Sequence, residues 1–97
     1  MDNYSVYQHG NTIRFECSFF DYDKTRVNPQ LVKFIIYNTK YEIVLETILG
    51  ESNKVGIGSY FFDYITGKEI KKYFYEWYGE IDGTPSLMRG QFATKFI

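Results

Sequence analysis

Hydrophobic and polar residues alternate along most of the chain, which is the period-two pattern of β-strands with one buried face. The pattern is clearest in residues 12–20, where the apolar positions are Ile13, Phe15, Cys17 and Phe19. Further strands are predicted at residues 31–37, 41–47, 60–64, 73–79 and 87–96. Short strands at this spacing, without a long amphipathic helix, predict an all-β sandwich or barrel.

Turn-forming residues separate these strands. Residues 38–40 predict a short hairpin turn, and the Asp-Gly-Thr-Pro segment at 82–85 predicts a tight turn before the last strand. Gly90 is expected to mark a bulge or bend within that strand. Residues 49–54 are expected to form a polar loop.

One row of side chains on each strand is expected to fill the layer between two packed sheets. The large predicted core residues are Phe15, Phe34, Tyr60, Phe62, Tyr75, Trp77 and Phe92. Ile43 with Leu45, and Phe96 with Phe92, are expected to complete the core.

The opposite strand faces are more apolar than a solvated sheet requires. The candidate interface residues on these faces are Leu31, Ile35, Tyr37, Phe61, Phe74 and Tyr78. An apolar sheet face marks an interaction site unless another part of the chain covers it. The aromatic N-terminal segment, with Tyr4 and Tyr7, offers either such a cover or a further contact surface.

The length of 97 residues suits one domain, an immunoglobulin-like antiparallel sandwich of about seven strands. Residues 1–10 are predicted to be an N-terminal arm or short edge strand, and residues 11–97 the sandwich. Neither a secretory signal nor an apolar run long enough to span a bilayer is evident. A single cysteine cannot form an intrachain disulfide, so we expect synthesis and folding in a cytoplasm.

Charge and motifs give little support for catalysis or for charged partners. The formal net charge is −1, with scattered basic residues, so neither nucleic acid nor a membrane is an expected partner. His9 is the only histidine and Cys17 the only cysteine, which predicts no metal site and an inert, packed thiol. The glycines at 56–58 fit a tight turn better than a phosphate loop. We expect a non-enzymatic protein without a cofactor.

Aromatic side chains also stack on sugars, and this leaves a second class of function open. Phe61, Phe74 and Tyr78 would form a stacking platform if they shared one surface. Binding of carbohydrate is therefore an alternative to binding of protein.

Several short motifs occur in a fixed order along residues 10–96. They are V-x-P at 27–29, Y-N at 37–38, G-x-G-x-Y at 56–60, Y-x-Y-x-W-x-G at 73–79 and R-G-x-F at 89–92. In this order they resemble a family of phage-encoded immunoglobulin-like virion proteins. The resemblance does not extend to the residues before Thr12.

The resemblance implies a structural component of a phage neck, tail or capsid surface, without chemistry or cofactor. From it we expect a virion protein made in a bacterial cytoplasm and located near the head–tail connection or in the tail. Its partners would be neighbouring virion proteins, with copies of the chain forming a homo-oligomer or ring. The alternatives are a capsid-surface decoration or adhesin that binds carbohydrate, and a cytoplasmic protein-binding module.

Overall fold

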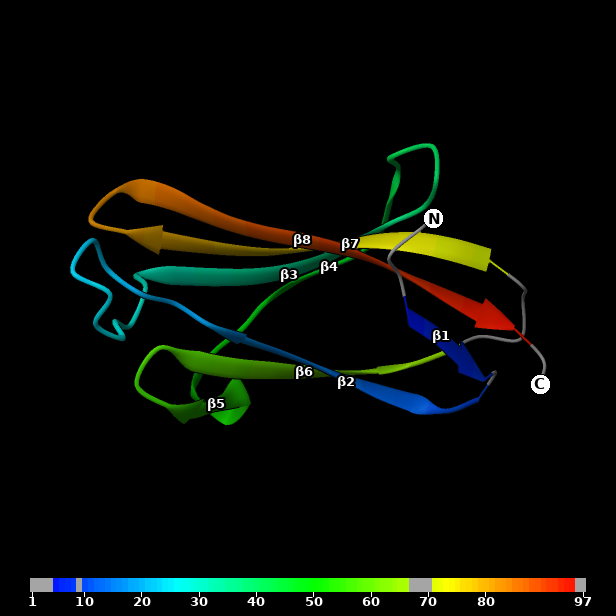
Figure 1. Ribbon diagram of the computed structural model, residues 1–97, viewed down its shortest axis with the longest axis horizontal. Helices are drawn as coiled ribbons and strands as arrows, with labels where there is room; N and C mark the ends of the chain where they lie inside the picture. Colours follow the sequence, from blue (N-terminus) through cyan, green and yellow to red (C-terminus); the bar gives the residue numbers. More distant parts are fainter. Residues whose placement is uncertain (1–4, 9, 67–70, 96–97) are drawn as a thin grey trace.

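Two facing β-sheets make up the fold (Figure 1). The computed structural model describes residues 5–8, 10–66 and 71–95. The larger sheet has the order β1-β8-β7-β3-β4, and the smaller has the order β2-β6-β5. The predicted all-β, sandwich-like architecture is confirmed, with no α-helix in the described ranges.

The strands of the larger sheet are β1 (Ser5–Gln8), β3 (Leu31–Tyr37), β4 (Ile43–Ile48), β7 (Lys71–Ile81) and β8 (Thr84–Lys95). Those of the smaller sheet are β2 (Thr12–Ser18), β5 (Lys54–Gly56) and β6 (Ser59–Ile65), and a short 3-10 turn covers Glu51–Asn53. All neighbouring strands pair antiparallel except β1, which joins β8 in parallel. Residues 5–8 thus form an edge strand, with Tyr7 opposite Thr94, whereas Tyr4 lies outside the described residues.

The core lies between the sheets and is built on aromatic contacts. Phe34 is fully buried, and its ring centroid lies 4.9 Å from those of Phe15 and Trp77 and 5.1 Å from that of Phe62. Of the large predicted core residues, five are buried: Phe15, Phe34, Tyr60, Trp77 and Phe92. The other two, Phe62 and Tyr75, are partly buried and pack against this cluster. Phe96 lies outside the described residues.

The prediction that Ile43 belongs to the core is wrong, because it is 57% exposed. A register shift between Ile36 and Tyr37 pairs Ile36 with Leu45 but Tyr37 with Ile43. A bulge of this kind puts two residues of one strand opposite one of its partner, so alternation no longer identifies the buried face. Leu45 remains packed against the core and Ile43 faces outward with Tyr37.

The turn predicted at residues 38–40 is longer than expected, and the following strand begins at Ile43. The Asn38 side-chain oxygen accepts hydrogen bonds from the N–H groups of Lys40 and Glu42, at 2.9 and 3.0 Å. Tyr41 adopts a left-handed conformation with φ of 63°. These local bonds hold residues 38–42 outside the ladder.

Leu49 is buried, although residues 49–54 were expected to form a polar loop. Its N–H donates to the carbonyl oxygen of Val32 at 2.9 Å, which continues the contact between β4 and β3 by one residue. The loop prediction is therefore wrong at its first position, where tertiary contact decides the burial. The loop prediction is also wrong at its last residue, Lys54, because β5 begins there.

The tight turn predicted at 82–85 is confirmed, and it joins β7 to β8. Asp82 and Gly83 have φ of 51° and 76°, as a two-residue type I′ hairpin requires. Gly90, in contrast, is not a bulge, since the β7–β8 register runs without a shift. A Cβ at Gly90 would lie 2.4 Å from the Tyr75 ring, so the glycine makes room for that ring.

Candidate interaction surface

The candidate interface residues divide between two opposite surfaces. Tyr37 pairs with Phe74 and Lys33 with Tyr78, which places these side chains on the outer face of the larger sheet. Phe61 pairs with Glu16 in the smaller sheet, on the side away from the core. The prediction of one stacking platform formed by Phe61, Phe74 and Tyr78 is therefore wrong, because the sheets lie back to back across the core.

Each of these three aromatic rings has another side chain against it. The guanidinium of Arg14 lies 4.2 Å from the centroid of Phe61, and the amino group of Lys33 lies 5.6 Å from that of Tyr78. The Tyr41 ring stacks on Phe74, with centroids 5.2 Å apart. The rings are half-buried rather than bare.

Ile35 is 5% exposed, so its predicted place in an exposed interface is wrong. Ile35 lies on β3, between β4 and β7 in the sheet. Its neighbours across the ladder are Glu46 on β4 and Glu76 on β7. Longer side chains on both flanks close over a residue at such a central position. Leu31 and Tyr37, at the two ends of the same strand, remain half-exposed.

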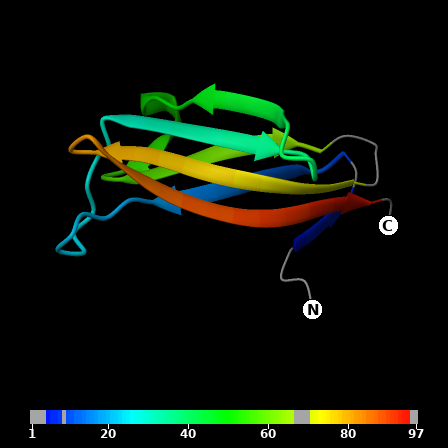
Figure 2. The same cartoon turned by 90° about the horizontal axis from the view of Figure 1, so that it is seen from above.

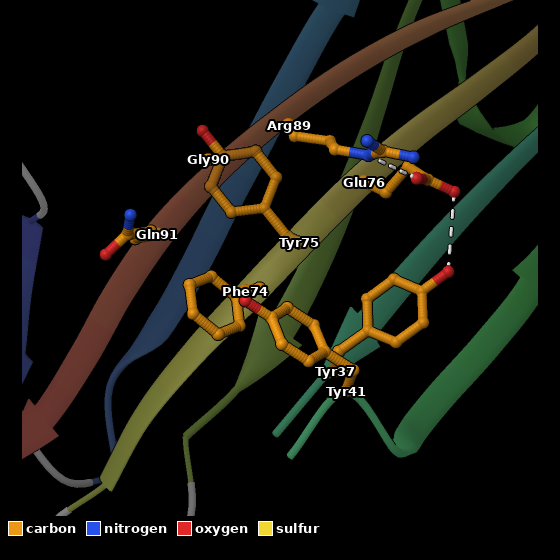
Figure 3. A pocket seen from close by; sticks show the side chains of 8 residues that line it. All are labelled: Tyr37, Tyr41, Phe74, Tyr75, Glu76, Arg89, Gly90 and Gln91. Atoms are coloured by element: carbon orange, nitrogen blue, oxygen red, sulfur yellow. Dashed lines mark hydrogen bonds and ion pairs between the residues drawn. The ribbon is translucent and has the colours of Figure 1, made fainter. Parts of the chain in front are cut away.

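A groove of about 480 Å³ crosses the outer face of the larger sheet (Figure 3). Its aromatic wall consists of Tyr37, Tyr41 and Phe74, and its other wall of Tyr75, Glu76, Arg89, Gly90 and Gln91. Tyr41 is 73% exposed and comes from the turn before β4. Tyr41 was not among the predicted interface residues, although the turn next to it was predicted at residues 38–40.

Glu76 is the buried polar centre of this groove. Arg89 donates from Nε to one carboxylate oxygen at 2.7 Å, and the Tyr37 hydroxyl approaches the other at 3.4 Å (Figure 3). Burial, reinforced by the Glu76 charge, raises the pKa of Tyr37, and the hydrogen bond to Glu76 raises the pKa of Arg89. Tyr37 therefore stays a neutral donor and Arg89 a cation, which fixes the charges of the groove.

Arg14 and Asp63 form a second polar group, on the smaller sheet. Arg14 binds both carboxylate oxygens of Asp63, at 2.8 and 2.9 Å, while it covers Phe61. The hydrogen bond lowers the pKa of Asp63. Arg14 and Asp63 therefore satisfy each other's charge, while Ile65 on the same face of β6 is 70% exposed.

Large apolar side chains are exposed at the margins of the larger sheet rather than at its centre. On β4 these are Ile43, Val44 and Ile48, and on β8 they are Leu87 and Met88. The sequence carried a signal for β4, because five of its six residues are uncharged and most are apolar, with Glu46 as its only charged residue. Its position at an edge, however, follows only from the sheet order.

Cys17 is buried between the sheets, with its sulfur 3.8 Å from the Met88 sulfur. Burial raises the pKa of the Cys17 thiol to about 12. At pH 8 only about one thiol in ten thousand is then ionised, and the thiolate is the reactive form. We expect a thiol reagent at pH 8 to label the protein in urea but not in its folded state. Rapid labelling of the folded protein would contradict the burial of the Cys17 thiol.

Within residues 5–8, 10–66 and 71–95, no three His, Cys, Asp or Glu side chains lie close enough together to hold a metal ion. His9 lies outside these ranges. The described part of the chain also has no helix of the length and apolarity needed to cross a membrane.

Comparison with known proteins gives no match to a protein-family model, to a curated protein or to a solved structure. The surface described above is therefore the basis for a functional assignment.

Proposed function

We propose that the protein is a non-enzymatic component of a bacteriophage particle that acts by packing against neighbouring virion proteins. The head–tail connection or the tail is its proposed location. In this proposal the sandwich is of the immunoglobulin-like type, as the resemblance implies. The exposed apolar side chains of β4 and β8, beside the aromatic groove, are the observation that carries the proposal.

Packing against protein explains why these side chains are apolar. Solvent-exposed edge strands normally carry charge or proline, because a bare apolar edge promotes association. The two margins of this sheet carry charge at Glu46 and Arg89, but they also expose large isoleucine, valine, leucine and methionine side chains. Partner contact would bury these side chains in the assembled particle.

Three glycines of the resemblance motifs act as determinants of the fold, which supports a scaffold role for these motifs. A Cβ at Gly58 would meet the Val27 carbonyl oxygen at 2.6 Å, and one at Gly79 would meet the Phe19 ring at 2.4 Å. Gly90 accommodates Tyr75 in the same way. These motif positions shape the core, which leaves the outer face and the edges for partners.

A double variant of the groove, Tyr41→Asn with Phe74→Ser, tests the proposal. Asparagine tolerates the left-handed conformation at position 41, so the turn should survive while the aromatic wall is lost. We expect the folded variant to be depleted from purified phage particles. The matched control is Phe61→Ser, which removes one aromatic ring from the opposite surface and should leave incorporation unchanged.

Incorporation is measured by mass spectrometry of gradient-purified particles, and folding by circular dichroism of the isolated chains. Equal incorporation of the double variant and the wild type would contradict a contact through the groove. Equal depletion of the double variant and the control would contradict the assignment of that contact to the larger sheet.

A further inference from the structure

The larger sheet has two open margins on opposite sides of the molecule. β4 ends the sheet order on one side. On the other side β1 pairs with residues 92–95 of β8, and no strand among the described residues lies beside the preceding half of β8. Figure 2 shows β4 and β8 along the two opposite margins.

The part of β8 available for pairing is the stretch from Leu87 to Gln91. The turn at residues 20–23 lies beside the first residues of β8, with which it lines a shallow hollow. Pro85 also cannot donate a backbone hydrogen bond. Within the described part of the chain, five residues of β8 are therefore unpaired on this side, and five residues of β4, from Val44 to Ile48, form the other margin.

Strand direction permits these margins to join in a repeating array. The neighbours β8, β7, β3 and β4 alternate in direction, because each pair is antiparallel. When two copies lie side by side with the same face outward, β4 of one therefore runs antiparallel to β8 of the next. No strand has to be reversed or exchanged.

The backbone groups of β4 face the open margin at alternate residues. The Leu49 N–H donates to Val32, so Leu49 and Val32 form a hydrogen-bonded pair. Hydrogen-bonded and non-bonded pairs alternate along an antiparallel ladder. The N–H and C=O groups of Glu46 and Ile48 consequently point away from β3, towards the open side.

The same alternation applies to β8, starting from its hairpin. Ile81 and Thr84 flank the two-residue turn and pair with each other, which makes them the first hydrogen-bonded pair. Pro85, Leu87 and Arg89 then have their backbone groups directed away from β7. Pro85 fits this alternation, because proline has no N–H group and its position is one whose backbone N–H would not bond to β7.

In the register set by these backbone groups, the side chains of the two margins are also complementary. Rows on the outer face run from Glu46 through Ile35 and Glu76 to Arg89. If such rows continue into a second copy, Glu46 meets the second copy's Arg89, and Ile48 meets its Leu87. One contact pairs opposite charges and the other buries two exposed aliphatic side chains. The Arg89 side chain is exposed, and its remaining N–H groups can donate to a second carboxylate besides that of Glu76.

We infer that the partner at these margins is a second copy of the chain, with β4 paired antiparallel to the open half of β8. The register places Glu46 opposite Arg89 and Ile48 opposite Leu87. The contact joins two different surfaces, so its repetition generates a ring or an open chain of subunits. This inference rests on the proposed packing function and specifies its first partner.

Cysteine cross-linking tests the register directly. Two variants in a Cys17→Ala background, Ile48→Cys and Leu87→Cys, are mixed under mild oxidation. Hydrogen-bonded pairs have Cα atoms about 5.5 Å apart, within the range of a disulfide. We expect the mixed disulfide to form at least about tenfold faster than in controls, because pairing raises the effective thiol concentration.

The matched control is Ile65→Cys mixed with Leu87→Cys. Ile65 is 70% exposed and Ile48 is 67% exposed, but Ile65 belongs to the smaller sheet. Equal rates for the two mixtures would overturn the inference. So would faster dimerisation of Ile48→Cys alone, because it would show β4 pairing with itself.

Lysine variants in particles separate this inference from the proposed function. Ile48→Lys places a charge on the edge and should remove self-association, whereas Ile65→Lys should not. Normal incorporation of Ile48→Lys into particles would overturn the edge contact and leave the virion role intact. Mixed cross-linking of a chain that is absent from particles would support the edge contact and overturn the virion role.

Discussion

Replacement of Phe34 by alanine is expected to lower the free energy of unfolding by about 3–5 kcal/mol, as for other buried phenylalanines. The ring is fully buried at the centre of the sandwich and contacts Phe15, Phe62 and Trp77. Its removal would lose apolar burial and leave a cavity that strands of two sheets cannot close. Urea unfolding followed by circular dichroism measures the loss.

The control for Phe34→Ala is Tyr22→Ala, since Tyr22 is an aromatic residue whose side chain is fully exposed. This change should leave the unfolding midpoint nearly unchanged. A loss below about 1 kcal/mol for Phe34→Ala would contradict the packing around this ring, because rearrangement would then have filled its space.

Alanine at Gly58 is the second large destabilisation that we expect, at about 2–5 kcal/mol from backbone strain and overpacking together. Gly58 has φ of 69°, and a Cβ would lie 2.6 Å from the Val27 carbonyl oxygen and 2.8 Å from that of Phe19. These are backbone atoms in the segments that pack beside β6. They cannot rotate away as the end of a side chain can.

Gly83 provides the matched control for Gly58, because it isolates the effect of the dihedral angle. It has φ of 76°, with no atom near the position of a Cβ. Gly83→Ala should therefore cost only about 1–2 kcal/mol of strain. Equal losses in the two variants, measured by urea unfolding, would contradict the close approach of Val27 and Phe19 to Gly58.

The faces of regular strands could be predicted from the sequence, because alternation is a local property. Phe15 and Trp77 are buried as their patterns indicated. Ile43 was misplaced since a bulge changes the alternation, and nothing in residues 41–47 marks it. Gly90 was read as a bend because its real reason, the Tyr75 ring, comes from the neighbouring strand.

The interaction surface was predictable only in part, because it depends on sheet membership and sheet order. Phe61 and Phe74 have similar local patterns, yet they belong to different sheets and face opposite sides. Ile48 could be recognised as apolar, but its exposure follows from the position of β4 at an edge. The groove combines Tyr41 from a turn with Arg89 from a strand distant in sequence.

The amount of this chain in purified phage particles tests the central claim most directly. Particles produced by the source culture would be banded on a density gradient, and the chain quantified against the major capsid protein by mass spectrometry. The proposed role predicts a fixed, low copy number per particle, as a ring at the neck or tail requires. Absence of the chain from intact particles would contradict the virion role and would make a cytoplasmic binding partner the better explanation of its exposed edges.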